Sequence, residues 1–251
     1  YPQCMGDYTP AEKRAARDEV IEEMYGDAEG FINTLAPRYF MPFAGSYTLA
    51  GSLADLNEFV ASPRRADARD YFETSDTIVH DHSEPILLDS EEYFDLDEEE
   101  ASASYTPVDP EARQQYIDEV LAERTLDYEH DEMPSLSTMT ELVEQAYEHV
   151  DDKRRDLNWE SDTDVLLDLG GTVANLSMQG EGVEFITRRE ADDIDEGYVR
   201  MSMDPRLLHR ILQGPQYAHF NNAQIGSHIE FEKQPDVYER ALYYTMSFLH
   251  T

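Results

Sequence analysis

The chain has 251 residues, of which 40% are hydrophobic, so it can bury one large or two modest cores and is too apolar for a disordered acidic tail. Its 55 Asp and Glu residues against 19 Lys and Arg give a formal net charge of −36, which argues against nucleic-acid binding because no basic face is available. No apolar run reaches the roughly 20 residues of a membrane span, and no signal peptide is visible, so we expect a cytoplasmic protein.

The acidic residues are dispersed along the chain, and the only lysines are Lys13, Lys153 and Lys233. Such a surface repels itself in dilute buffer, whereas molar salt shortens the Debye length to about 3 Å and screens most of the repulsion. Dispersed acid with scarce lysine resembles the proteins of salt-loving archaea. An acidic surface built for a basic partner would instead predict clustered acid and ordinary lysine use, so we favour the halophilic interpretation.

The single cysteine, Cys4, excludes an internal disulfide and a cysteine-based zinc or iron–sulfur centre within the chain. It fits an intracellular protein. The sequence begins at Tyr1 inside what reads as the middle of a domain, so we expect a fragment of a longer protein.

A long helix is predicted after the polar entry segment. Thr9 can cap the first amides, Pro10 suits the first helical position, and Glu12 completes a capping box. Apolar residues then keep helical spacing as far as Leu35, with a break expected near Gly26.

The stretch 36–45 predicts a short buried strand that leads into a loop. Its centre is apolar and β-compatible, and Pro37 and Pro42 bound it. We expect Gly45 to begin the loop and four side chains to be largely buried: Tyr39, Phe40, Met41 and Phe43. A helix, a strand and a Gly-bearing loop in this order are typical of α/β enzyme sites, and a core strand with a simple turn is the other interpretation.

Further elements are predicted as far as residue 162. They are a helix at 52–60, short strands at 77–80 and 85–88, an acidic linker at 91–104, and helices at 109–121 and 140–156. The linker is expected to be exposed because it consists of acid and small residues.

From Thr163 the sequence predicts strands with helices after them, which indicates an α+β module. Strands are expected at 165–169, 173–178, 183–187, 198–203 and 225–231, and helices at 204–214 and 235–249. Gly170-Gly171 lacks the Lys-Ser/Thr of a phosphate loop, so it predicts a hairpin.

His80-Asp81-His82 has metal-ligand residue types. A strand would place both imidazoles on one face, but a site needs a third nearby ligand, so we favour a polar edge or turn.

A second polar cluster is His219, Asn221 and Asn222, followed by Gln224. These side chains can cap a helix, or they can converge beside Phe220 as in a sugar or nucleotide pocket. The residues favour neither interpretation.

Three segments share their order and spacing with one known family: Tyr-Pro-Gln-Cys at 1–4, Pro-Arg-Tyr-Phe-Met-Pro-Phe-Ala-Gly at 37–45, and Ile225-Gly226 followed by Gln234-Pro235-Asp236-Val237-Tyr238. They resemble the metallo-β-lactamase-fold part of CMP-N-acetylneuraminate hydroxylase and its prokaryotic relatives, akin to sugar-phosphate lactonases. The superfamily's His-x-His-x-Asp-His motif is absent from the chain. Ala44 stands where many members carry a late metal-binding histidine, and one cysteine cannot build the hydroxylase's Rieske centre.

The resemblance implies an α/β to α+β fold in three parts. Residues 1–96 would be the C-terminal part of a metallo-β-lactamase-like αββα sandwich, 97–162 an acidic linker and helical segment, and 163–251 a smaller α+β module. The last part also resembles sterol-carrier-like domains.

The resemblance further implies part of a metal-dependent hydrolase, or less so an oxygenase-related protein, that acts on a phosphorylated or nucleotide-linked sugar. No catalytic residue is assigned, and no metal or other cofactor is expected within this chain, although a longer parent protein would hold zinc, iron or manganese. The expected pocket residues are Tyr1, Gln3, Phe43, Gly45, Ser46, Tyr47, His219, Asn221 and Asn222. Expected partners are a small-molecule substrate and the remainder of the metallo-β-lactamase domain, without nucleic acid or membrane. The alternative is a non-catalytic ligand-binding or interaction module.

Overall fold

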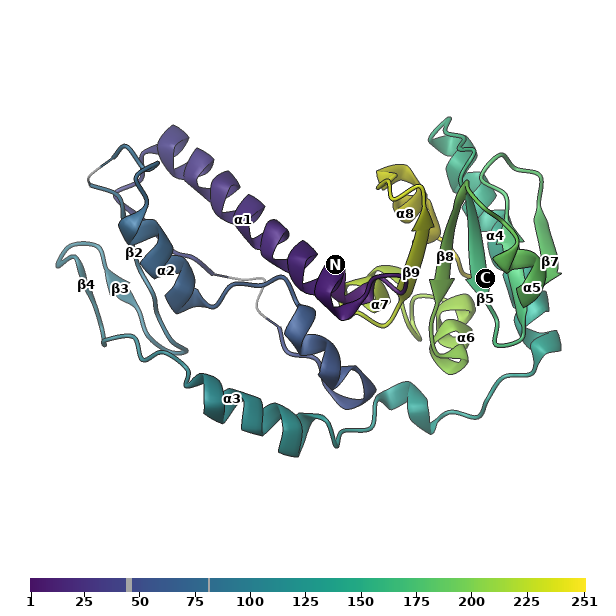
Figure 1. Cartoon of the computed structure of the whole chain (residues 1–251), viewed down its shortest axis with the longest axis horizontal. Helices are drawn as coiled ribbons and strands as arrows, with labels where there is room; N and C mark the ends of the chain where they lie inside the picture. Colours follow the sequence, from purple (N-terminus) through teal and green to yellow (C-terminus); the bar gives the residue numbers. More distant parts are fainter. Residues whose placement is uncertain (44–46, 81) are drawn as a thin grey trace. The chain divides into compact units, whose positions relative to one another are not determined.

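The chain folds into two compact units (Figure 1). The computed structural model describes residues 1–43, 47–80 and 82–251. Unit 1 comprises Tyr1–Gln3 and Thr9–Arg124, and unit 2 comprises Cys4–Tyr8 and Thr125–Thr251. Both contain helices and strands, so the mixed α/β class is confirmed at that level. The units divide inside the segment 97–162, which the sequence predicted to be one part.

Unit 1 begins with the predicted long helix, α1 (Pro10–Leu35). Its capping box is present: the Thr9 side chain accepts a hydrogen bond from the Glu12 amide, and Oε2 of Glu12 accepts from the Thr9 amide at 2.8 Å. The break expected at Gly26 is absent, because a glycine costs a helix only about 1 kcal/mol and the turns on either side hold it in place.

A second helix, α2 (Arg65–Thr74), packs against α1 and was not predicted from the sequence. The contact consists of Ile32 from α1 with Ala68 and Phe72 from α2. Beside it, the rings of Tyr25 and Tyr71 stack with centroids 4.2 Å apart.

The remaining helices of unit 1 are short. The helix predicted at 52–60 is a 3₁₀ helix, η2 (Gly51–Phe59), and the one at 109–121 is α3 (Pro110–Tyr116) running into a π-helical turn, η3 (Ile117–Leu121). Ala54, Ile117 and Leu121 form a small cluster between η2 and η3.

The strands of unit 1 are two residues long. β1 (Tyr39–Phe40) pairs in parallel with β2 (Glu84–Pro85), and β3 (Phe94–Asp95) pairs with β4 (Glu100–Ala101) as a hairpin within the expected exposed linker. The strand predicted at 77–80 is absent, because the Val79 amide donates to the Asn33 side chain instead of to a neighbouring strand.

The expected burial of residues 39–43 is wrong in part. Tyr39 and Phe40 are half-buried, but Met41 is 40% and Phe43 74% exposed. The pairing stops at Phe40, because Pro42 has no amide hydrogen to extend a ladder and β2 ends at Pro85. Gly45, where we expected the loop to begin, lies outside the described residues.

Unit 2 is built on a five-stranded sheet in the order β7-β6-β5-β8-β9. Its strands are β5 (Asp164–Asp168), β6 (Thr172–Leu176), β7 (Val183–Thr187), β8 (Tyr198–Ser202) and β9 (Glu230–Gln234). β5 and β8 run parallel, and the other neighbours are antiparallel. The β5–β6 pair confirms the hairpin predicted at Gly170-Gly171.

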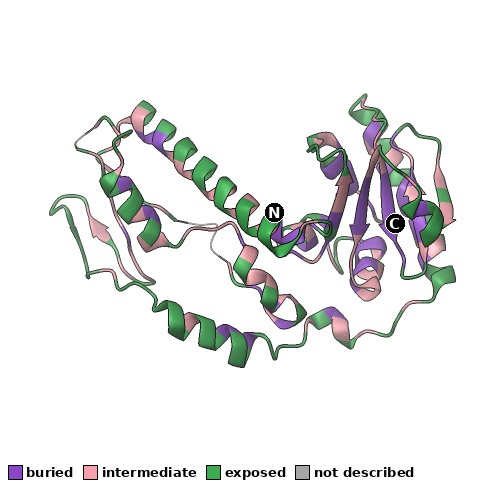
Figure 2. Ribbon diagram, viewed as in Figure 1, coloured by how far each residue is buried: buried purple, intermediate pink, exposed green. Residues whose placement is uncertain are grey.

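Helices cover both faces of this sheet. α4 (Leu136–Asp156), α6 (Pro205–Gln213) and α8 (Arg240–Met246) share a large core with one face of the strands, including Val165 and Met201. α5 (Arg188–Asp192) packs Ala191 on Leu166 and Val173 of the other face. Figure 2 shows the buried residues concentrated on the central strands.

Two elements of unit 2 differ from the sequence prediction. The strand expected at 225–231 begins only at Glu230, because residues 220–225 form the helix α7 (Phe220–Ile225), which buries Phe220 and Ala223. The last helix is shorter than 235–249, since it ends where the Ser247 hydroxyl donates to the Tyr244 carbonyl.

None of the described helices is both long and apolar enough to cross a membrane.

Candidate ligand-binding pockets

Two of the predicted site residues of unit 1 lie together. Nε2 of Gln3 donates to the Tyr47 hydroxyl at 2.9 Å, and Nζ of Lys13 donates to the Gln3 carbonyl at 3.4 Å. Gln3 is buried, whereas Tyr1 and Phe43 are largely exposed. Gly45 and Ser46 lie outside the described residues.

The predicted residues of unit 2 form a helix cap. Nδ1 of His219 accepts from the Asn221 amide at 3.1 Å, and the side chains of Asn221 and Asn222 are exposed. This geometry is the capping arrangement, in which a side-chain acceptor satisfies an amide at a helix start.

His80 and His82 lie side by side, with ring centroids 5.4 Å apart. Their Nε2 atoms face backbone carbonyls at the end of α1, that of Asn33 at 3.1 Å and that of Ala36 at 3.4 Å. Among the described residues, no group of three or more His, Cys, Asp or Glu side chains could hold a metal ion.

A cationic cavity lies within unit 1, and we call it the arginine pocket. Its volume is about 790 Å³. Its polar and aromatic lining includes Tyr47, Thr48, Asn57, Arg64, Arg65, Asp67, Arg69, Asp70, Tyr105, Arg113 and Gln114. Four arginines thus face one cavity in a chain that has only 19 basic residues.

Arg113 differs from the other three arginines in its partners. Its Nη2 donates to Oγ1 of Thr48 at 3.1 Å, and no ion pair joins it to a carboxylate of a described residue. The guanidinium has five N–H donors, so most of them remain for a ligand.

The other arginines are held by carboxylates. Arg64 makes two hydrogen bonds to Asp67, and Arg69 bonds Asp70; these bonds raise the pKa of both guanidinium groups, which stay charged. Arg65 donates to the Leu88 carbonyl and lies with its guanidinium carbon 5.0 Å from the Tyr105 ring centre.

The arginine pocket can bind an anion beside an aromatic surface. Arginine binds phosphate and carboxylate oxygens through paired N–H groups, and the tyrosine rings offer flat contact area to a sugar or a base. A sequence signal for this pocket is the run 63–69, in which three of the four arginines lie at the start of α2: Arg64 precedes the helix, and Arg65 and Arg69 belong to it.

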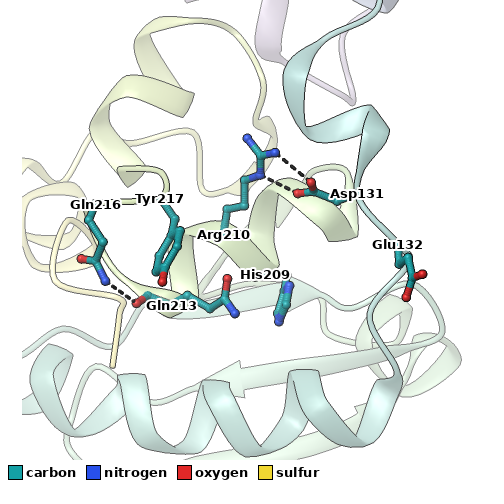
Figure 3. Close-up of a pocket in the computed structure, with 7 residues that line it drawn as sticks. All are labelled: Asp131, Glu132, His209, Arg210, Gln213, Gln216 and Tyr217. Carbon is teal, nitrogen blue, oxygen red and sulfur yellow. Dashed lines mark hydrogen bonds and ion pairs between the residues drawn. The ribbon is translucent and has the colours of Figure 1, made fainter.

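A second cavity lies within unit 2, and we call it the amide pocket (Figure 3). Its volume is about 570 Å³, and it is lined by Asp131, Glu132, His209, Arg210, Gln213, Gln216 and Tyr217. Arg210 bonds both oxygens of Asp131, at 2.5 and 2.8 Å, which lowers the pKa of that carboxyl. None of its residues was singled out from the sequence, since the segments 131–132 and 209–217 are distant in the chain.

Searches against protein-family models, curated proteins and solved structures found no match to this chain.

Proposed function

We propose that unit 1 binds a phosphorylated or nucleotide-linked sugar in the arginine pocket, as part of a hydrolase of the metallo-β-lactamase superfamily. One observation supports the binding: Arg113, without a carboxylate partner among the described residues, faces a cavity that it shares with three further arginines and two tyrosines.

The phosphate is proposed to bind Arg113. A guanidinium–phosphate contact is charge-assisted and bidentate, and Oγ1 of Thr48 already fixes one end of the fork. The base or sugar would lie along Tyr105, whose ring is held by Arg65. Tyr47, anchored by Gln3, would close the same cavity.

The hydrolytic step rests on the sequence resemblance alone. In the superfamily that the chain resembles, a bound metal would supply the activated water. Among the described residues, no group of side chains forms a ligand set for it. A non-catalytic ligand-binding module is the second candidate, because the arginine pocket can bind an anion without a metal.

Calorimetric titration in molar KCl tests the binding. Glucose 6-phosphate and cytidine monophosphate are expected to bind, and glucose is not. Arg113→Gln should weaken phosphate-ester binding about ten- to hundredfold, since a hydrogen bond to a charged group contributes about 1.5–3 kcal/mol.

Arg124→Gln is the matched control, because Arg124 is exposed, belongs to unit 1 and does not line the pocket. Equal binding by the two variants would contradict the proposal. Turnover of a phosphodiester or lactone, together with metal found by elemental analysis, would favour the hydrolase over the binding module.

A further inference from the structure

The amide pocket is walled by two segments that are locked together. One is η4 (Asp127–His130) with the two residues after it, and the other is α6 with the turn that follows. Beside the Arg210–Asp131 pair, Nη1 of Arg206 donates to the Glu129 carbonyl at 2.6 Å. The cavity is therefore formed before any ligand arrives.

A glycine allows the turn to fold back over α6. Gly214 has a φ of +121°, and a Cβ atom there would lie 2.8 Å from Oε1 of Gln216. The Tyr217 amide donates to the Gly214 carbonyl at 3.0 Å, and Nε2 of Gln216 donates to the Gln213 carbonyl at 3.3 Å. These contacts bring Gln213, Gln216 and Tyr217 to one side of the cavity (Figure 3).

The charges in the pocket disfavour an anionic ligand. The only guanidinium, that of Arg210, directs two of its nitrogens at Asp131. Glu132 adds a negative charge without a balancing cation in the lining. A phosphate would therefore meet a neutralised arginine and a repelling carboxylate.

The remaining groups suit a neutral polyol. Tyr217 is 59% exposed and presents an aromatic ring, while two primary amides, an imidazole and a carboxylate supply donors and acceptors around it. Aromatic faces pack on the C–H face of a sugar ring, and amide and carboxylate groups pair with neighbouring hydroxyls.

We propose that the amide pocket of unit 2 binds a neutral saccharide, with Tyr217 as the stacking surface and Gln213, Gln216 and His209 as hydroxyl partners. This site is independent of the arginine pocket, because its residues lie in unit 2 and its charges favour a neutral ligand over an anionic one.

Saturation-transfer NMR on the full chain in molar KCl tests the site. The probes are glucose, galactose, N-acetylglucosamine and maltose, and at least one should receive saturation. Tyr217→Ala should reduce the affinity about two- to tenfold, whereas Tyr217→Phe, which keeps the ring, should retain most of it.

Tyr93→Ala is the matched control, because Tyr93 is 64% exposed and lines neither pocket. Arg113→Gln should also leave saccharide binding unchanged, which separates this site from the proposed function. The proposal is overturned if no neutral sugar binds, if Tyr217→Ala binds as well as the unaltered chain, or if spermidine or inorganic phosphate displaces the sugar from the pocket.

Discussion

At the residue scale, a half-buried imidazole couples the stability of unit 2 to pH. His228 lies with Nδ1 3.3 Å from the Tyr128 hydroxyl. Burial lowers the pKa of His228, partly opposed by Glu129, and burial raises the pKa of Tyr128 to about 12. The phenol therefore stays neutral throughout the acidic pH range in which the imidazole takes up its proton.

The sign of this coupling follows from proton uptake. Because the pKa of His228 is lower in the folded state, the unfolded chain binds more protons as the pH falls through about 6.5. We expect the free energy of unfolding of unit 2 to be greatest above that pH and to fall between it and the lower folded pKa. His228→Gln should flatten this part of the profile.

Urea unfolding in molar KCl at a series of pH values measures the effect. Trp159, the only tryptophan, packs against the core of unit 2, so its fluorescence reports that unit. His130→Gln is the control, because His130 is exposed in the same unit. A profile that His228→Gln leaves unchanged would refute the assignment.

Residue-level prediction succeeded where the contact is local in sequence. The capping box of Thr9 and Glu12 spans three residues, so the sequence contains all of it. The contact between Arg113 and Thr48 spans 65 residues and depends on how unit 1 folds, so no spacing could reveal it. The part of the arginine pocket that Arg113 and Thr48 form was missed for that reason.

At the element scale, α6 shows how a predicted pattern of apolar residues contributes to the stability of unit 2. Its apolar positions are all buried, and the Leu208 side chain is fully buried in the core of unit 2. We expect Leu208→Ala to lower the free energy of unfolding by about 2–5 kcal/mol, through lost burial and the cavity left behind.

Urea unfolding followed by Trp159 fluorescence again provides the measurement. Leu208→Met keeps the volume and should cost less than about 1.5 kcal/mol. Leu136→Ala, on an exposed side chain of α4, should change stability by no more than about 0.5 kcal/mol. If Leu208→Ala and Leu136→Ala lowered the free energy of unfolding by similar amounts, the packing of α6 in the core would not account for the stability of unit 2.

Element prediction was most accurate at β7 and β8, whose ends lie within one residue of the predicted bounds. It failed at Ile225, which was predicted to start a strand but is the last residue of α7. Phe220 and Ala223 are both buried, and their spacing of three residues is that of a helix. It failed at Phe43 because a two-residue ladder gives no face to bury a side chain. The burial expected of Met41 and Phe43 is therefore wrong.

At the scale of the whole molecule, the acidic residues are spread over both units, whereas the hydrophobic core of unit 2 is much larger than the clusters of unit 1. The formal charge of −36 spans the chain. The main cluster of unit 2 contains buried residues from four strands and several helices, and partly buried residues of β7 pack against it. The clusters of unit 1 among the described residues contain three buried residues each. Unit 1 thus has much less burial to set against the repulsion between its carboxylates.

We expect lowered salt to unfold unit 1 before unit 2. As KCl is reduced from molar to roughly 0.1 M, the Debye length grows from about 3 to about 10 Å and repulsion reaches across neighbouring elements. Far-UV circular dichroism, which reports α1 and the other helices, should lose signal while Trp159 fluorescence remains native. Sucrose at matched osmolality should protect far less than KCl, because it does not screen charge. Coincident transitions would mean that the two units unfold as one, and a signal that stays flat to low salt would mean that the acidic residues serve a purpose other than adaptation to salt.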